Sequence, residues 1–289
     1  MSGVRLSGLY FYPVKSLRGV AADSVEVDSL GIVGDRRFMV VDESGRFLTQ
    51  RTLPCMATVK ASIGPAGLEL SKDNFCGIRV SIAASGDVGR SLGKVTVWND
   101  ENLAAEDCGD EPAAWLSQVL GIKCRLARIG REFSRPIPPH KLAGMPGNPN
   151  SGATSSHFMS FADAFPFLIL GEASLDDLNQ RLGSIGEQAL PMNRFRPNLV
   201  IAGSAPYAED GWKRIRIGKL VFSVGGPCAR CAITTTDQMT GDRGVEPLRM
   251  LSIYRRDPAQ PTKVNFGQNL IHETKSGTLA IGDQVEVLE

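Results

Sequence analysis

Residues 4–42, VRLSGLYFYPVKSLRGVAADSVEVDSLGIVGDRRFMVVD, show the pattern that decides the fold. Short runs of Val, Leu, Phe and Tyr alternate with turn residues such as Asp28-Ser29-Leu30-Gly31. β-branched and aromatic residues favour strands, whereas Gly and Asp favour the turns between them. The alternation continues through FLTQRT at 47–52 and KVTVW at 94–98. The spacing therefore predicts a small β-barrel or sandwich in this part of the chain.

Helical signals are fewer and more widely spaced. Residues 111–120 carry one apolar face with a proline in the first turn, which predicts a helix. Ser174 stands three residues before Asp177 and predicts the N-terminus of a second helix. Strands are expected at 197–201 and, from its β-branched residues, at 233–236. We therefore expect a mixed fold class that is mainly β with α/β elements.

The segment Arg128 to His157 interrupts this pattern. It is dense in Pro, Gly and Ser and shows no sustained hydrophobic period. Such a composition predicts a long loop, lid or connector, and we expect it to shape the entrance of a site. The chain length suits two lobes, which we place at residues 1–125 and 126–289.

The charge balance excludes some classes of function. The 289 residues include 32 Lys and Arg against 31 Asp and Glu, so we expect no nucleic-acid partner, and any anion site has to be local. No apolar stretch approaches the roughly 20 residues that cross a bilayer, and the N-terminus lacks a signal-peptide pattern. We therefore expect no membrane attachment and a cytoplasmic location.

The chain contains six cysteines, and it is far too long to need disulfides for stability, so reduced thiols are expected. Cys55, Cys76, Cys108 and Cys124 stand singly, and single cysteines usually serve as small hydrophobic side chains. The segment Gly226-Pro227-Cys228-Ala229-Arg230-Cys231 is different, because it brings two thiols close together. This pair is the candidate for chemistry.

Two thiols separated by two residues have three common uses. A structural zinc site needs two further ligands, but His140, His157 and His272 are scattered and no second cysteine pair is present. A thioredoxin-like redox pair opens a helix, whereas residues 233–236 predict a strand. The third use is a thiolate presented to a soft metal, with Arg230 favouring the charged form. Spacing alone leaves two structural cysteines as an equal alternative and does not choose between the sulfurs.

Several short motifs also occur in a definite order. They are Tyr12-Pro13-Val14-Lys15-Ser16, Gly34-Asp35-Arg36-Arg37-Phe38, Phe161-Ala162-Asp163, Glu172-Ala173-Ser174-Leu175, Phe195-Arg196-Pro197-Asn198, Tyr207-Ala208-Glu209-Asp210 and Cys228-Ala229-Arg230-Cys231. Together they resemble the MOSC-domain proteins, specifically the branch with an N-terminal β-barrel lobe that includes the mitochondrial amidoxime-reducing components and their bacterial relatives. The resemblance covers almost the whole chain, and it implies an N-terminal MOSC β-barrel domain followed by a MOSC β-barrel domain with peripheral helices.

The resemblance implies a molybdenum cofactor, with molybdenum carried by molybdopterin, held between the two lobes and bound through the Cys231 sulfur as the metal ligand. A doubly charged phosphate group is held best by guanidinium, ammonium and hydroxyl donors, so a near-neutral chain can still bind it. The residues that match cofactor-holding positions are Lys15, Ser16, Arg36, Arg196, Asn198, Ala229, Arg230 and Cys231.

Asp163 matches an acidic residue near the metal, which implies a catalytic role beside Cys231. It would hydrogen-bond a metal-bound water or supply a proton when an oxygen leaves. From its own neighbourhood, Asp163 reads equally well as a cap of the bend that ends at Pro166. Arg51, in Thr49-Gln50-Arg51, matches a basic position whose role the resemblance does not define.

The resemblance implies an enzyme that reduces small N-hydroxylated compounds, namely hydroxylamines, amidoximes and hydroxylaminopurines, to amines by removing oxygen. Electrons would come from a separate reductase that carries a flavin or an iron–sulfur centre. The alternative is a non-catalytic carrier of the cofactor or of sulfur. Sulfurases of the family join a related domain to a pyridoxal-phosphate domain, for which 289 residues leave no room. A structural zinc protein is a third possibility.

Overall fold

The computed structural model describes residues 3–81, 91–143, 145 and 157–289. Its largest sheet has eight strands, and all neighbouring strands are antiparallel except the parallel pair β12 and β13. The strand order across this sheet is β18 (Val285–Val287), β14 (Arg214–Ile217), β15 (Leu220–Ala229), β16 (Asn265–His272), β12 (Phe167–Gly171), β13 (Leu199–Ala202), β1 (Arg5–Phe11) and β2 (Val20–Ala21).

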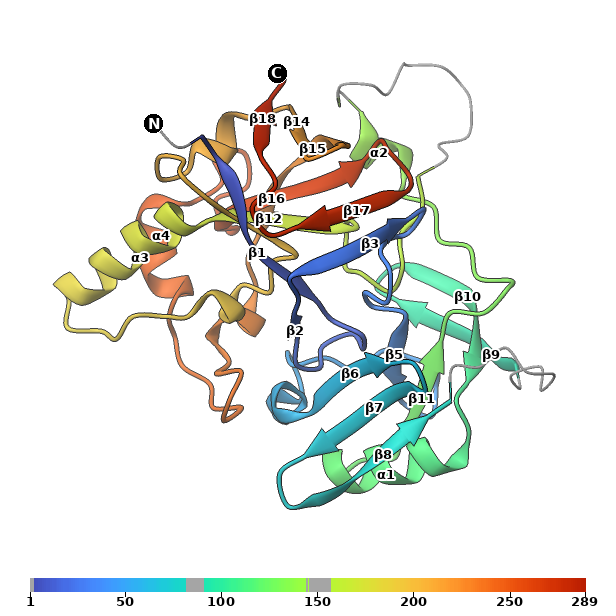
Figure 1. Cartoon of the computed structure of the whole chain (residues 1–289). Helices are drawn as coiled ribbons and strands as arrows, with labels where there is room; N and C mark the ends of the chain where they lie inside the picture. The colour runs from blue at the N-terminus through green and yellow to red at the C-terminus, as the bar shows by residue number, and fades with distance from the viewer. Residues whose placement is uncertain (1–2, 82–90, 144, 146–156) are drawn as a thin grey trace.

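The N-terminal strands lie beside strands from the end of the chain. β1 pairs with β13, and β3 (Ser24–Asp28) lies between β4 (Gly31–Ile32) and β17 (Gly277–Ala280). Figure 1 shows these blue strands among the yellow and red ones. Inward-facing side chains of both sheets share one buried core. The chain therefore starts in the same lobe in which it ends, and crosses between the lobes after β4.

The other lobe contains two smaller sheets and a helix. One sheet has the order β5 (Phe38–Val41), β11 (Arg125–Arg128), β10 (Asp100–Asp107) and β9 (Ser91–Val97), and the other has the order β6 (Lys60–Gly64), β7 (Gly67–Lys72) and β8 (Phe75–Val80). A short 3-10 helix, η1 (Pro54–Thr58), leads into the second sheet. A mainly β fold was predicted and is confirmed.

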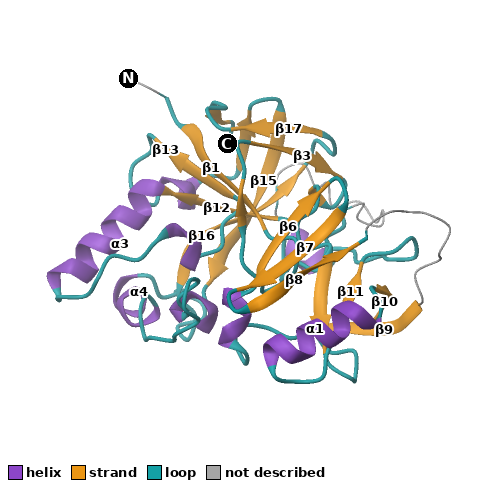
Figure 2. Cartoon of the chain, turned by 60° about the horizontal axis from the view of Figure 1, so that its bottom comes forward, coloured by secondary structure: helices purple, strands orange, loops and turns teal. Residues whose placement is uncertain are grey.

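Helix α1 (Asp110–Leu120) confirms the helix predicted at 111–120. Its apolar face, which includes Trp115 and Leu116, is buried in the core of the smaller sheets. Gly121 ends the helix in the left-handed conformation at φ 71°, and its N–H bonds back to the Ser117 carbonyl. Figure 2 shows α1 on the outside of this lobe, away from α3 and α4.

Helices α3 (Glu172–Ser184) and α4 (Leu248–Tyr254) pack against each other through a separate apolar cluster. The N-terminus predicted at Ser174 was wrong, because α3 already begins at Glu172. The Ser174 hydroxyl is buried and donates to the Glu209 carboxylate at 2.8 Å. This serine therefore ties α3 to the turn at η3 (Ala208–Gly211) instead of capping the helix.

Two predicted strands are absent. Residues 47–52 form a single bridge at Phe47 and then turns, and residues 233–236 fall mostly in a one-turn 3-10 helix, η4 (Ala232–Thr235). In η4 the hydroxyls of Thr234 and Thr235 donate hydrogen bonds to the carbonyls of residues three positions earlier in the chain. Such local hydrogen bonds compete with a strand ladder. The strand predicted at 233–236 is therefore wrong, because the threonines that favoured it also carry hydroxyls that form local hydrogen bonds.

The segment Arg128 to His157 is partly ordered and partly outside the described residues. Arg128 ends β11, and Pro139–Leu142 form the short helix α2. Residues 144 and 146–156 lie outside the described part of the chain. Among the helices that are described, none is both long enough and apolar enough to cross a membrane.

Candidate functional site

Two arginines from distant motifs stack on one tyrosine, and we call Tyr12, Arg36 and Arg196 the Tyr12 cluster. The guanidinium carbons of Arg36 and Arg196 lie 4.5 and 4.2 Å from the centre of the Tyr12 ring. Arg36 Nη1 donates to Asp35 Oδ2 at 2.6 Å and to Asn198 Oδ1 at 3.1 Å. The cluster therefore joins the two lobes through cation–π contacts and the Asn198 amide.

Arg196 has no acidic partner within ion-pair distance among the described residues, although it is only 9% exposed. Its Nη1 donates to neutral oxygens, the Leu17 carbonyl at 2.7 Å and Gln238 Oε1 at 3.4 Å. Burial lowers the pKa of Arg196 to about 10, and the nearby Arg36 adds to this effect. A buried cation without a counter-ion is costly, so this pocket has surplus positive charge that an anion would balance.

Three residues predicted to hold the cofactor share an unusual backbone. Ser16, Arg36 and Arg196 adopt φ values of 65°, 49° and 54°, in the left-handed region that non-glycine residues seldom occupy. Each costs of order 1 kcal/mol or more and persists only where the surroundings impose it. Such strain gathers at ligand sites, and here it falls on three separate loops.

A buried pair of glutamines holds these loops together. Gln50 Nε2 donates to the Ser16 carbonyl at 2.8 Å and to Gln238 Oε1 at 3.1 Å, and Gln238 Nε2 returns a bond to Gln50 Oε1 at 2.9 Å. Gln238 also accepts from Arg196. The two amides thus connect the loop of Ser16 with the loop that follows η4.

A second group surrounds a carboxylate, and we call Asp163, Lys15, Arg51 and Trp98 the Asp163 cluster. Lys15 Nζ donates to Asp163 Oδ1 and, at 2.8 Å, to the Phe161 carbonyl. Arg51 Nη2 donates to Asp163 Oδ2 at 3.0 Å, and the Trp98 indole N–H donates to Oδ1 at 3.2 Å. In contrast to Arg196, the cations here have a counter-ion.

In this cluster, burial and ion pairing shift the pKa values of Asp163 and Lys15 in opposite directions. Desolvation would raise the pKa of Asp163, but Lys15 and Arg51 outweigh it and hold the pKa of this carboxyl well below its ordinary value. Desolvation lowers the pKa of Lys15 to about 8, although Asp163 partly offsets it. At neutral pH Asp163 is therefore an anion, while Lys15 holds a proton that it can release.

The two cysteines occupy different surroundings. β15 continues through Cys228, and Cys231 immediately precedes η4. Arg230 Nη1 lies 3.0 Å from Cys228 Sγ, and its Nη2 donates to the Phe195 carbonyl at 2.5 Å, next to the Tyr12 cluster. Burial lowers the pKa of the Arg51 guanidinium, but Asp163 and, to a smaller extent, Cys231 outweigh burial and raise it. Cys231 therefore lies near Arg51 of the Asp163 cluster.

Some donors near the sulfurs have no partner in the described structure. Arg51 Nη1 and Arg230 Nε are buried without a hydrogen bond. Buried donors are normally satisfied, so these two suit an acceptor that is not part of the chain. Within the described residues no group of three His, Cys, Asp or Glu side chains could hold a metal, which leaves the zinc alternative without supporting geometry.

The structure thus brings some of the predicted site residues into contact and leaves others apart. Lys15 contacts Asp163 and Arg36 contacts Asn198 directly, whereas Arg36 and Arg196 are linked through the Tyr12 ring. Ala229 is exposed at the end of β15, where its backbone pairs with Asn265. The roles of these residues toward a cofactor stay predictions.

Sequence reasoning missed several residues of the site. Tyr12 and Gln50 belong to motifs quoted above, but only their neighbours Lys15, Ser16 and Arg51 were matched to family positions. Trp98 and Gln238 had no recognisable signal. The prediction for the single cysteines was wrong at Cys76, which is exposed, whereas Cys124 is buried and Cys55 and Cys108 are half-buried.

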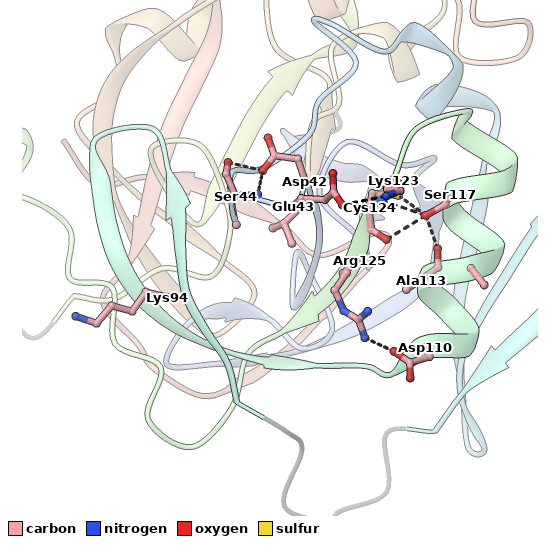
Figure 3. A pocket seen from close by; sticks show the side chains of 13 residues that line it. Asp42, Glu43, Ser44, Lys94, Asp110, Ala113, Ser117, Lys123, Cys124 and Arg125 are labelled. Carbon is pink, nitrogen blue, oxygen red and sulfur yellow. Dashed lines mark hydrogen bonds and ion pairs between the residues drawn. The ribbon is translucent and has the colours of Figure 1, made fainter.

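A cavity also lies outside both clusters. It has a volume of about 590 Å³ between the β5 end and α1, and Figure 3 shows that charged side chains line it. Lys123 pairs with Glu43, and Arg125 pairs with Asp110. None of its lining residues belongs to either cluster, so we do not assign the site to it.

The chain matches two family models. The model described as the MOSC N-terminal beta barrel domain matches residues 3–123, and the model described as the MOSC domain matches residues 157–286. Mitochondrial amidoxime-reducing component 1 of Mus musculus is 32% identical over 97% of this chain and 81% of its own length. Molybdenum cofactor sulfurase of Danio rerio is also 32% identical, over 98% of this chain but only 34% of its own.

Among solved structures, the YuaD protein from Bacillus subtilis aligns over 98% of this chain and 94% of its own. The sequence identity is 10% and the TM-score is 0.36. A similarity of this size carries no argument about the site.

Proposed function

This chain belongs to the MOSC-domain family with an N-terminal β-barrel domain, and we propose that it is a molybdenum-cofactor-dependent reductase of N-hydroxylated compounds. The substrate classes are hydroxylamines, amidoximes and hydroxylaminopurines, which would be reduced to amines. The observation that carries the proposal is the buried, unpaired Arg196 guanidinium beside Arg36. An anionic cofactor supplies the charge that this pocket lacks.

The residues present fit such a group. Arg36 and Arg196 would hold its phosphate, helped by the Ser16 loop, and Cys231 would be the thiolate ligand of the metal. Arg51 Nη1 and Arg230 Nε, which have no hydrogen-bond partner, would donate further hydrogen bonds to the anion. Fixed cations and backbone donors favour an anion without reorganisation at the moment of reaction.

When bound, the molybdenum cofactor supplies the two-electron chemistry that takes oxygen from nitrogen. The reduction consumes two electrons and two protons and releases water; the chain supplies the binding pocket and one of the protons, and the other comes from solvent. Lys15 holds a proton at neutral pH that a departing oxygen can take from Nζ, because its pKa is about 8. Asp163, whose pKa is held low, orients Lys15 and Arg51 and does not serve as the acid. This refines the catalytic role predicted for Asp163.

Carriage of the cofactor or of sulfur is the second candidate. It is favoured by the equal identity to a relative named a molybdenum cofactor sulfurase, although this chain spans about a third of that relative. The contact of Arg230 with Cys228 Sγ at 3.0 Å also suits a sulfur that accepts or passes a group. In the reductase reading, electrons come from a separate flavin or iron–sulfur protein. The cytoplasmic location stays a prediction.

Two measurements on the purified protein separate these functions. We expect one molybdenum and one pterin per chain by metal analysis and absorbance. With reduced viologen dye as the electron source, the loaded protein should convert benzamidoxime to benzamidine. Full loading without any benzamidine formed would favour carriage, and one zinc without molybdenum or pterin would refute both.

A further inference from the structure

Trp98 is a large aromatic residue in an unusual position. It directly follows β9, its indole is 39% exposed, and its backbone lies in the left-handed region at φ 58°. A bulky residue in this region is a conformational outlier. The surrounding structure therefore holds a strained aromatic residue at the surface, where burial of the ring gives only part of the usual stabilisation.

Three contacts fix the orientation of the indole. Its N–H donates to Asp163 Oδ1 at 3.2 Å, and the Arg51 guanidinium carbon lies 4.5 Å from the ring centre. The Phe47 ring meets it edge-on, with centres 5.0 Å apart and planes at 61°. An indole held in this way is preorganised, so a ligand that stacks on it loses little side-chain freedom.

The indole is part of the solvent-exposed surface of the Asp163 cluster. The Lys15 side chain is 5% exposed and that of Arg51 24%, whereas the Asp163 side chain is 44% exposed. Asp163 and Trp98 are thus the members that face solvent. A molecule that contacts the Asp163 carboxylate from solvent therefore has exposed indole surface beside it.

We propose that Trp98 selects substrates by stacking its exposed aromatic surface against a planar π system. The inference rests on the proposed reductase function and narrows its substrate class. Planar amidoximes and N-hydroxylated purine bases are favoured over compact hydroxylamines. Aromatic stacking has a preferred geometry and adds to simple burial of apolar area, which a fixed indole exploits and an aliphatic side chain does not.

The first test compares two substrates on the loaded enzyme. Trp98→Leu should raise the KM for benzamidoxime about tenfold and the KM for hydroxylamine by a clearly smaller factor, so that the ratio of the two KM values rises. Trp98→Phe keeps a ring but loses the N–H, and it should keep most of the preference for benzamidoxime. Trp212→Phe is the matched control, since Trp212 packs against the core of the large sheet.

Other results would overturn the proposal. An equal rise of KM for both substrates would mean that Trp98 only supports the site. A Trp98→Phe variant as impaired as Trp98→Leu would mean that the hydrogen bond to Asp163 is what matters. Molybdenum content is measured for every variant, so that a loss of cofactor is not mistaken for a loss of substrate binding.

A binding measurement separates this inference from the proposed function. Benzamidine, a planar amidinium, should quench tryptophan fluorescence in the loaded wild type and in Trp212→Phe but not in Trp98→Phe. If the wild type reduces neither substrate, the reductase proposal fails, and the quenching alone decides on Trp98. Quenching that requires Trp98 supports the stacking role, and quenching that is absent or independent of Trp98 refutes it.

Discussion

The Tyr12 cluster and the Asp163 cluster both contain buried cations, but they differ in how many of these cations contact a carboxylate. Arg36 has one carboxylate partner and Arg196 has none among the described residues. Lys15 and Arg51 instead share the two oxygens of Asp163. A buried cation without a carboxylate contact suits the binding of an anion, whereas a lysine that is paired with a carboxylate and has a lowered pKa suits the transfer of a proton. The candidate site thus contains two regions that suit different tasks.

The largest effect is expected at Cys231, the sulfur that lies near Arg51 of the Asp163 cluster. Cys231→Ala should reduce benzamidoxime turnover by about a thousandfold or more, because the metal loses its protein ligand. Cys228→Ala is the matched control and should keep a measurable fraction, since Arg230 holds that sulfur toward Phe195. Steady-state rates and molybdenum content check this. The opposite ranking of the variants would assign the ligand to Cys228.

The next effect concerns Arg196, the buried cation that has no carboxylate partner among the described residues. Arg196→Met should weaken cofactor binding about 10- to 100-fold, as expected for the loss of charge-assisted hydrogen bonds. The cofactor-free protein should unfold at the same or a higher temperature, because an unbalanced buried charge is removed. Cofactor titration and thermal unfolding measure both quantities.

Arg194→Met is the control for this pair of measurements. Arg194 is paired with Asp237 at 2.9 Å, so its loss should lower the unfolding temperature and leave cofactor affinity nearly unchanged. If Arg196→Met instead destabilises the free protein and binds cofactor normally, the Tyr12 cluster is a structural joint between the lobes.

The smallest expected effect is the pH dependence of kcat, which reports on Lys15 in the Asp163 cluster. Lys15 must be protonated to donate, and its pKa is lowered to about 8, so kcat should be flat below this pH and fall about tenfold per unit above it. Asp163 raises the pKa of Lys15, so Asp163→Asn should move this fall to lower pH. Lys15→Met should lack it. A pH–rate profile that is identical in all three proteins would remove Lys15 from the proton path.

Local patterns predicted some elements within a residue and missed others completely. α1 follows from its apolar period and the proline in its first turn. The position of Ser174 predicted a helix cap, yet its hydroxyl donates instead to the Glu209 carboxylate, which lies in a distant turn. β16 was not predicted, because Asn265 and Gln268 interrupt its apolar pattern. Both polar side chains are buried, Asn265 paired with Asp257 and Gln268 with Asp210. Asp210 lies 58 residues from Gln268, beyond the reach of a local pattern.

The sequence by itself determined the mainly β architecture, the cysteine pair and the motifs that contain Lys15, Arg36 and Arg196. Only the tertiary structure decided that Lys15 meets Asp163, 148 residues away, while Arg196 meets no acid among the described residues. The physical reason is range. Alternation and capping report on chain neighbours, whereas the charge balance of a buried group depends on what lies within a few ångströms in space.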